Sequence, residues 1–363
     1  MNYPQAEKWV VEALQAGMVI PAHPLALDEH GRFDVRCQRA LTRYYAAAGA
    51  GGLAVGVHTT QFEIRQKGID LLEPALRTAA DALGEIQRHG GKRLVRIAGI
   101  CGPTAQACGE AALAASLGYH AGLLSLAALA KADDDELVSH CQKVAAQIPL
   151  VGFYLQPAVG GRRLGVEFWR RFAQIPSVVA IKMAPFNRYQ TLDVVRGVAL
   201  SGRAGQVALY TGNDDNIVAD LLTEFAFRVN GQEVRQRIVG GLLGHWAVWT
   251  SKAVELLARC HEAADVRAEP QARRLCYQEL LTLAAQVTDC NAALFDVAHD
   301  FAGCIAGIQH VLAGQGLLVS TRCLNPRETL SPGQAQEIDR VRGEYPQLVD
   351  DDFVAAHLKE WLE

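Results

Sequence analysis

Apolar and polar residues form alternating blocks along the first two thirds of the chain, and the blocks predict short buried strands separated by helices. The strand-like blocks lack polar alternation, so we expect both faces of the sheet to be covered. Between them, apolar residues recur with a helical period of about 3.6 residues, for example in residues 36–48, 105–117 and 134–147. The predicted strands are residues 18–22, 52–57, 93–100, 121–124, 150–155, 178–182, 206–210 and 239–243.

Eight strand–helix units within about 250 residues predict a (β/α)8 TIM barrel of the α/β class. The alternative, a doubly wound sheet, favours a glycine-rich phosphate loop after the first strand, where this chain has Pro21-Ala22-His23-Pro24-Leu25. We therefore predict that residues 1–250 form a barrel carrying the active site. Residues 251–363 are predicted to be helices packed on that barrel, with helical periodicity over residues 252–264, 270–287, 291–314 and 331–344. The polar stretch 228–237 is predicted to be an exposed loop or a longer helix.

Composition narrows the classes of protein that the chain can represent. Of the 363 residues, 50% are hydrophobic and 20% are charged, and the net charge is −4 with scattered basic residues. This balance predicts neither a nucleic-acid interface nor a membrane-binding face. The nine cysteines lack a C-x-x-C pair, and no H-E-x-x-H motif occurs, so we expect reduced thiols, no metal site and a cytoplasmic location.

Lys182 is the residue most suggestive of chemistry, because it interrupts the apolar, β-branched segment Val178-Val179-Ala180-Ile181. Burying an ammonium group costs several kcal/mol of folding free energy unless the group is paired or neutralised. A lysine held neutral at pH 7 is a nucleophile for carbonyl carbons. The alternative is a structural lysine whose stem crosses the edge of the core while its charge reaches solvent.

The ends of barrel strands meet at one mouth, so the residues at those ends are the other candidates. Tyr154, on the strand next to Lys182, is expected to face it and to transfer protons. Thr59 and Thr60 are expected to hold a carboxylate. The further candidates, each with an ordinary structural alternative, are His23 and His58 as mouth residues, Gly212 and Asp214 as a substrate-binding turn, and His245 with Trp246 as walls of a bulky pocket.

Several of these segments resemble one family, the dihydrodipicolinate synthase / N-acetylneuraminate lyase family of class I Schiff-base aldolases. Phe153-Tyr154-Leu155-Gln156-Pro157 resembles its "Y-N-x-P" strand, and Ala180-Ile181-Lys182 resembles its "G-I-K" strand. Residues 24–34 resemble its opening segment, residues 47–60 its glycine-rich approach to a Thr-Thr pair, and residues 209–214 its "G-x-D" turn. The spacing of 28 residues from Tyr154 to Lys182 also matches.

The resemblance implies a role for each matching residue. Lys182 would form the imine and Tyr154 would transfer protons. Thr59 and Thr60 would bind the carboxylate of the substrate, and Thr59 would also form a relay with Tyr154. It also implies a pyruvate-like 2-oxo acid as one substrate and an aldehyde as a possible second. Finally, it implies a homotetramer built as a dimer of dimers, with neither a metal nor an organic cofactor.

The chain departs from the family pattern where a second substrate would bind. The family's "G-T-T-G-E" appears as His58-Thr59-Thr60-Gln61-Phe62-Glu63, and its "T-P-Y-Y" turn as Ser125-Leu126-Ala127-Ala128. Val159 stands near the place of the family's substrate-binding arginine, although Arg162 and Arg163 follow. These differences predict a divergent member that does not make dihydrodipicolinate.

The sequence therefore predicts a lyase that forms a Schiff base between Lys182 and a 2-oxo acid. Aldol cleavage or condensation, or hydration or dehydration, would follow next to the enamine. Two alternatives stay open. One is an aldolase-derived protein that binds a 2-oxo acid without turnover, and the other is a barrel enzyme that uses His58 or His245 as an acid/base group without an imine.

Overall fold

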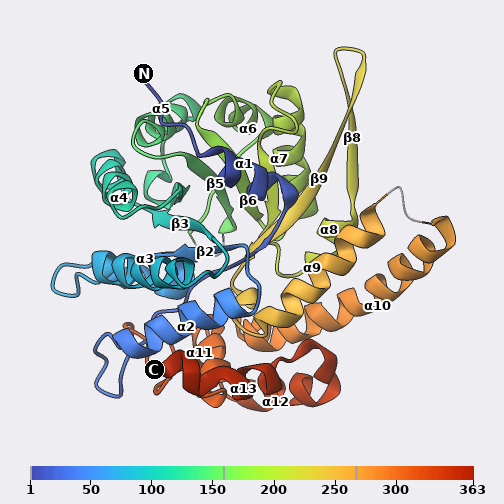
Figure 1. Cartoon of the computed structure of the whole chain (residues 1–363). Coiled ribbons are helices and arrows are strands. Elements are labelled where there is room, and N and C mark those ends of the chain that lie inside the picture. Colours follow the sequence, from blue (N-terminus) through green and yellow to red (C-terminus); the bar gives the residue numbers. More distant parts are fainter. Residues whose placement is uncertain (1, 158–159, 266–268) are drawn as a thin grey trace. The chain divides into compact units, whose positions relative to one another are not determined.

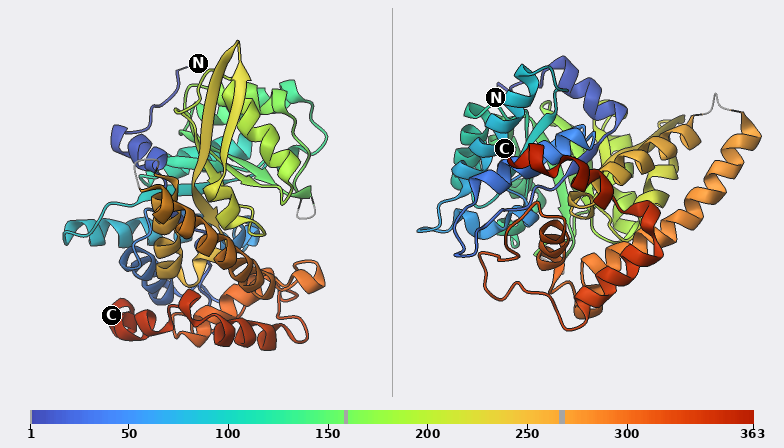
Figure 2. Two further views of the ribbon diagram at one scale, coloured as in Figure 1. Left: turned by 90° about the vertical axis from the view of Figure 1, so that its right-hand side faces the viewer. Right: turned by 60° about the horizontal axis from the view of Figure 1, so that its bottom comes forward.

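The structure, a computed structural model, describes residues 2–157, 160–265 and 269–363. The chain divides into two compact units (Figures 1 and 2). Unit one comprises Met1–Met18 and Val95–Leu242, and unit two comprises Val19–Leu94 and Leu243–Glu363. The predicted boundary at residue 250 stays a prediction. Within the described residues, no helix is both long enough and apolar enough to span a membrane.

Unit one is built around a parallel sheet with the strand order β3-β4-β5-β6-β7-β9. Strands β3 to β7 are almost continuously apolar and buried, as expected when helices cover a parallel sheet, whereas the first half of β9 is polar and largely exposed. The predicted bounds of β4 and β5 are confirmed to the residue, and β6 runs two residues past Lys182. The strands are β3 (Val95–Ile100), β4 (Ala121–Leu124), β5 (Leu150–Leu155), β6 (Val178–Ala184), β7 (Ala208–Thr211) and β9 (Gln232–Leu243).

One helix precedes the strands of unit one and others follow β3 to β7, and their apolar sides supply much of the core of this unit. In α6, for example, Phe168, Trp169 and Phe172 are all buried. The helices are α1 (Lys8–Ala16), α4 (Thr104–Ser116), α5 (Asp134–Ala145), α6 (Val166–Ala173), α7 (Arg188–Leu200) and α8 (Ile217–Leu222), with the short 3-10 helix η3 (Ala127–Leu129).

The polar stretch 228–237 is neither a loop nor a helix, and that prediction is wrong. It lies in an antiparallel hairpin of β8 (Glu224–Val229) and β9. The two residues between the strands, Asn230 and Gly231, have φ of 49° and 81°. Asn-Gly favours positive φ at both positions, and such a turn matches the twist of a two-residue hairpin. The polar composition therefore reflects an exposed ribbon (Figure 1).

Unit two holds two further strands, which are joined in parallel by a bridge between Ala22 and Ala54. Its other elements are helices, as predicted for residues 252–264 and the segments that follow. The strands are β1 (Val19–Pro21) and β2 (Gly52–Val55), and the helices are α2 (Val35–Ala47), α3 (Leu72–Arg88), α9 (Thr250–Ala264), α10 (Pro270–Leu294), α11 (Cys304–Gly314), α12 (Gln334–Glu344) and α13 (Asp351–Leu362). Its short 3-10 helices include η2 (Phe62–Arg65), η6 (Val297–His299) and η7 (Pro346–Leu348).

One helix prediction in unit two needs correction. The periodicity over residues 291–314 predicts a continuous helix, but α10 continues to Leu294 and α11 begins only at Cys304. Between them, Asp296, Asp300 and Phe301 have positive φ of 57°, 53° and 68°. The carboxylate of Asp296 accepts hydrogen bonds from the Gly303 N–H at 3.0 Å and from the hydroxyl of Ser331 at 2.5 Å. Local side-chain hydrogen bonds thus compete with the helix and interrupt it.

Buried polar contacts connect the helices within unit two. The carboxylate of Asp350, which is 2% exposed, accepts hydrogen bonds from the Tyr44 hydroxyl at 2.8 Å and from the Ser251 N–H at 3.1 Å. Since α2 carries Tyr44 and α9 carries Ser251, one side chain fixes both helices to the start of α13.

The complete order of elements is that of a (β/α)8 barrel with C-terminal helices, as predicted. The parallel strands β1 to β7 and β9 alternate with helices along the chain, and α9 to α13 follow the last strand. The doubly wound alternative is therefore not the fold of this chain.

Candidate active site

Lys182 lies in the middle of the fully buried strand β6, and its side chain is only 9% exposed. Burial removes water from the ammonium group and lowers the pKa of Lys182 to about 8, while the nearby carboxylate of Asp214 opposes that shift. At pH 7 about a tenth of these amines is therefore neutral, a far larger fraction than for a lysine in water.

The strand register determines which side chains share a face with Lys182. Lys182 lies opposite Phe153 on β5 and opposite Tyr210 on β7. Its Nζ atom is 4.7 Å from the centre of the Phe153 ring, a distance at which an ammonium group is attracted to the ring face. Phe153 is thus the residue of β5 whose side chain lies beside the amine of Lys182. Phe153 could not be predicted from the sequence, because sequence alone does not fix the register of a parallel pair of strands.

The expectation that Tyr154 faces Lys182 is wrong in this structure. Tyr154 lies opposite Met183, and adjacent residues of a strand point to opposite faces of the sheet. The Tyr154 ring instead packs on Trp169 of α6, with ring centres 5.2 Å apart. Its hydroxyl accepts a hydrogen bond from the Leu164 N–H at 3.1 Å and donates one to the Leu164 carbonyl at 3.2 Å. Tyr154 therefore anchors the segment that leads into α6.

Gly212 covers the aliphatic stem of Lys182. A Cβ atom built at Gly212 would lie 2.5 Å from the Cε atom of Lys182 and 2.9 Å from the Cβ atom of Ala184. The Gly212 N–H donates to the Met183 carbonyl at 2.6 Å, which holds this backbone against β6. Only glycine fits here without displacing the lysine, and this is a physical reason for the glycine in the predicted substrate-binding turn.

We expect Gly212→Ala to displace Lys182 and to slow imine formation. The extra methyl group overlaps the lysine stem, and overpacking of this kind costs about 1–3 kcal/mol of stability. Borohydride trapping with pyruvate, together with thermal unfolding, measures both effects. Gly109→Ala in α4 is the matched control, since no atom lies within 4 Å of its added Cβ. Equal trapping rates for Gly212→Ala and the wild-type chain would contradict the placement.

A buried polar network holds the turn that carries Asp214. The side chain of Asn213 donates to the carboxylate of Asp220 at 2.9 Å and to the hydroxyl of Thr191 at 3.1 Å. The hydroxyl of Thr211 donates to the same carboxylate at 2.7 Å, and Arg188 forms an ion pair with it. This network could not be predicted from the sequence, because its members are spread from residue 188 to residue 220.

The other predicted site residues at the end of β2 are largely committed to local structure within unit two. The 3-10 helix η1 (His58–Thr60) follows that strand. The Thr60 hydroxyl donates to the His23 carbonyl at 2.7 Å and accepts from the Gly56 N–H at 2.9 Å, and the Thr59 hydroxyl donates to the Ala22 carbonyl at 2.8 Å. Both hydroxyl protons thus hold the turn, and carboxylate binding by this pair stays a prediction.

The predicted mouth histidines differ in their surroundings. The half-buried His58 lies with its ring centre 5.9 Å from that of Phe62. His23 is fully buried against Thr42, 2.9 Å away, and desolvation lowers its pKa to about 4. It therefore stays neutral in the interior near pH 7 and acts as a structural residue.

His245 and Trp246 lie in the 3-10 helix η5 (His245–Ala247), which follows β9. Burial lowers the pKa of His245 to about 4 as well, so this imidazole is neutral near pH 7. Trp246 is 2% exposed, and its carbonyl accepts a hydrogen bond from the Thr250 hydroxyl at 2.7 Å. The predicted role of both residues in shaping a substrate pocket stays a prediction.

The predicted site residues belong to both units. Lys182, Tyr154, Gly212 and Asp214 lie in unit one, and the structure brings Gly212 and Asp214 to Lys182. The remaining predicted residues, His58, Thr59, Thr60, His245 and Trp246, lie in unit two. Val159, at the place of the family's arginine, lies outside the described residues.

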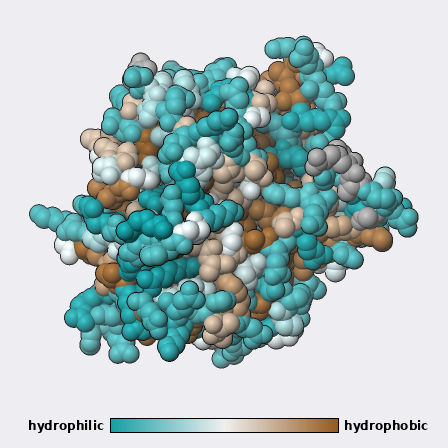
Figure 3. Space-filling model, viewed as in Figure 1, coloured by the Kyte–Doolittle hydropathy of each residue, from teal (hydrophilic) through white to brown (hydrophobic). Residues whose placement is uncertain are grey.

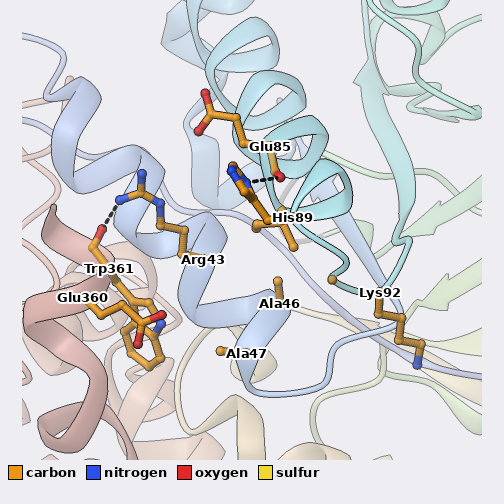
Figure 4. A pocket seen from close by; sticks show the side chains of 10 residues that line it. Arg43, Ala46, Ala47, Glu85, His89, Lys92, Glu360 and Trp361 are labelled. Atoms are coloured by element: carbon orange, nitrogen blue, oxygen red, sulfur yellow. Dashed lines mark hydrogen bonds between the residues drawn. The ribbon is translucent and has the colours of Figure 1, made fainter.

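Unit two also has an open pocket of about 450 Å³, lined by residues of α2, α3 and the C-terminal segment (Figure 4). At its wall, the Arg43 guanidinium donates to the Trp361 carbonyl at 2.6 Å, and the His89 Nδ1 atom lies 2.9 Å from the Glu85 carbonyl. None of the predicted site residues lines this pocket.

Comparison with solved structures shows the fold independently. Dihydrodipicolinate synthase from Agrobacterium tumefaciens matches 91% of this chain and 98% of its own, with 20% identity and a TM-score of 0.68. The synthase from Oceanobacillus iheyensis matches 93% and 99%, with 14% identity and a TM-score of 0.70. N-acetylneuraminate lyase from Fusobacterium nucleatum, complexed with pyruvate, matches 92% and 98%, with 12% identity and a TM-score of 0.68. These likenesses establish a TIM barrel.

The family of this chain follows from comparing its sequence with known proteins and with models of protein families. No protein with a curated description matches the chain. The model described as the "Dihydrodipicolinate synthetase family" matches residues 15–224, more than half of the 363 residues. The low identities to the solved structures mark a divergent member. The chain therefore belongs to the dihydrodipicolinate synthetase family.

Proposed function

We propose that this protein is an aldolase-type lyase that forms a Schiff base between Lys182 and a 2-oxo acid, most simply pyruvate. The observation that carries the proposal is the state of the amine. Lys182 is buried in an apolar strand, and its pKa is lowered to about 8. Family membership supports the lyase class, and the particular reaction is our inference.

The chemistry starts with the neutral amine. Its lone pair attacks the ketone carbon and forms a C–N bond, while the carbonyl oxygen takes up a proton to give a carbinolamine. Protonation and departure of this hydroxyl as water leave the imine. Loss of a proton from the adjacent methyl group then gives an enamine. The nucleophilic carbon of the enamine forms a bond to the carbonyl carbon of an aldehyde, or the reverse step breaks that bond and releases the aldehyde. In the alternative reaction, water is added or lost next to the enamine.

Asp214 is the group that we assign to these proton transfers. Its carboxylate lies near enough to Lys182 to raise the amine's pKa against desolvation, and Gly212 brings the same turn onto the lysine stem. A positioned carboxylate is a general acid/base group of the required kind. Tyr154, predicted for this task, would need its ring to leave Trp169.

The remaining assignments concern the substrate's other end. We propose that Thr59 and Thr60 contact the carboxylate, with Thr59 in the proton relay, and that His58, His245 and Trp246 contact a second, less polar substrate. The lyase from Fusobacterium nucleatum was crystallised with pyruvate, which supports a pyruvate-like ligand for this chain. A cytoplasmic homo-oligomer arranged as a dimer of dimers completes the proposal.

A second candidate function is a 2-oxo-acid-binding protein without turnover. One observation favours this function. The residue of β5 whose side chain lies beside the amine of Lys182 is Phe153, which carries no transferable proton. Such a protein would form the imine and stop before carbon chemistry.

Borohydride reduction in the presence of pyruvate tests the proposal. We expect a covalent adduct on Lys182, identified by peptide mass spectrometry, with a rate that rises with pH up to about 8 and then levels, because only the neutral amine attacks. A folded protein without an adduct would overturn the proposal. Enamine-dependent deuterium exchange into the methyl group of pyruvate separates the two candidates, since the binding protein would give the adduct without exchange.

A further inference from the structure

The outer strand of the β8–β9 hairpin has an unpaired edge. Among the described strands, β8 pairs only with β9 (Figure 1). Val229 lies opposite Gln232 across the two-residue turn, and Phe227 and Phe225 continue this series toward the base of the hairpin. In such a hairpin the residues beside the turn exchange hydrogen bonds, and so does every second pair after them.

The alternate residues of β8 therefore direct their backbone groups away from β9. These residues are Glu224, Ala226 and Arg228, and the side chains of all three are exposed. Exposed edges of this kind are templates for pairing with another strand. The paired residues of this hairpin, 224–229 and 232–237, all lie in unit one.

We propose that β8 is a docking surface for β8 of a second copy of this chain. The two strands would run antiparallel about a two-fold axis at Ala226. In that register Ala226 lies opposite Ala226 of the second copy, and Glu224 lies opposite Arg228 of the second copy, twice. These are the residues whose backbone groups point outward, so about six hydrogen bonds form between the strands.

The charges on the strand select this register and the identity of the partner. An axis at Glu224 or at Arg228 would place like charges opposite each other, which is destabilising. An axis at Phe225 or Phe227 would place both charged residues opposite uncharged ones. Edge charges usually discourage pairing, but the opposite signs two residues on either side of Ala226 favour one partner, a copy of the same strand.

The other face of the paired ribbon would gain aromatic contacts. Phe225 and Phe227 are half-buried within one chain, and they alternate with the charged residues along β8. About the axis at Ala226, each Phe225 lies opposite Phe227 of the second copy in a close, non-hydrogen-bonded pair. Figure 3 shows apolar side chains on this ribbon beside hydrophilic ones. The two copies of β8 thus match each other on both faces of the paired ribbon, by opposite charges on one face and by aromatic rings on the other.

Sedimentation of the full chain over a wide range of concentrations tests the proposal. We expect the wild-type chain to self-associate and Ala226→Pro to raise the dissociation constant of that association by at least about tenfold, because proline removes an outward N–H donor. The hairpin itself tolerates this proline, since the Ala226 N–H does not bond to β9. Ala226→Thr is the matched control, because it keeps the N–H and is expected to associate like the wild-type chain.

Disulfide trapping tests the register directly. Two residues in a hydrogen-bonded antiparallel pair have Cα atoms about 5.5 Å apart, within the range of a disulfide. Ala226→Cys should therefore form a 226–226 bond between copies, whereas Arg228→Cys should not form a 228–228 bond. Peptide mass spectrometry distinguishes these bonds from any that involve the nine native cysteines. A monomeric wild-type chain, or self-association that Ala226→Pro leaves unchanged, would overturn the proposal, as would the absence of the 226–226 bond.

Discussion

Lys182→Met is expected to abolish the pyruvate adduct and to lower turnover by many orders of magnitude, while making the protein more stable. Methionine has nearly the same shape as the lysine stem but has no nucleophile, so the first covalent step is lost. If activity persists instead, the chain would be an imine-independent enzyme that uses a group such as His58.

The gain in stability follows from the lowered pKa of the amine. The folded pKa of about 8 lies below the ordinary value of 10.5, so between these pH values the unfolded chain binds more protons than the folded one. The free energy of unfolding of the wild-type chain therefore contains a penalty from Lys182 that is fully present below pH 8, where it amounts to about 3 kcal/mol. The penalty disappears as the pH rises toward 10.5.

Denaturant unfolding of the two proteins at several pH values checks this expectation. Lys182→Met should unfold at higher denaturant concentration at pH 7, and the difference should shrink between pH 8 and pH 10.5. Lys143→Met in α5 is the matched control, since that lysine is exposed and its replacement should change neither stability nor adduct formation. A variant at Lys182 less stable than the wild-type chain at pH 7 would show that the amine is stabilised in the fold. A buried reactive amine held at the expense of stability is the usual compromise of an active site.

The sequence was sufficient to predict Lys182 because the signal is local. An ammonium group within a run of β-branched residues is costly wherever that run is buried, whatever the details of its neighbours. The alternation of strands and helices was sufficient for the barrel for a similar reason, since continuous apolar strands are characteristic of sheets covered on both faces. Both features depend on residues close together in the chain.

The partners of Lys182 could not be predicted in the same way. Whether Phe153 or Tyr154 accompanies the amine depends on register, and a shift of one residue exchanges the two faces of a strand. The 28-residue spacing from Tyr154 to Lys182 matches the family, but in this structure the ring of Tyr154 packs on Trp169. The hairpin differs from these cases, because its Asn230-Gly231 dipeptide is a local signal for a two-residue turn. The polar residues on either side of that turn nevertheless favour a loop or a helix over strands.

Asp214→Asn is expected to have opposite effects on imine formation and on the carbon chemistry that follows. Removing the carboxylate removes the interaction that raises the pKa of Lys182, so the amine's pKa should fall below about 8 and adduct formation should reach half its maximum at a lower pH. Asparagine cannot transfer protons as a carboxylate does, so deuterium exchange per adduct should fall by about 10²–10⁴-fold. Trapping at a series of pH values and exchange monitored by NMR measure the two effects separately.

Tyr154→Phe distinguishes this assignment from the one predicted from sequence. Phenylalanine keeps the packing on Trp169 but loses the two hydrogen bonds to Leu164, so we expect a loss of stability of about 1–3 kcal/mol. Adduct formation and exchange should stay close to the wild-type values. If Tyr154→Phe lowers exchange as strongly as Asp214→Asn while leaving the pH profile of trapping unchanged, Tyr154 is the proton-transfer residue and its ring must reach the amine in another conformation. If only Asp214→Asn affects both, the carboxylate both sets the charge of Lys182 and transfers the proton.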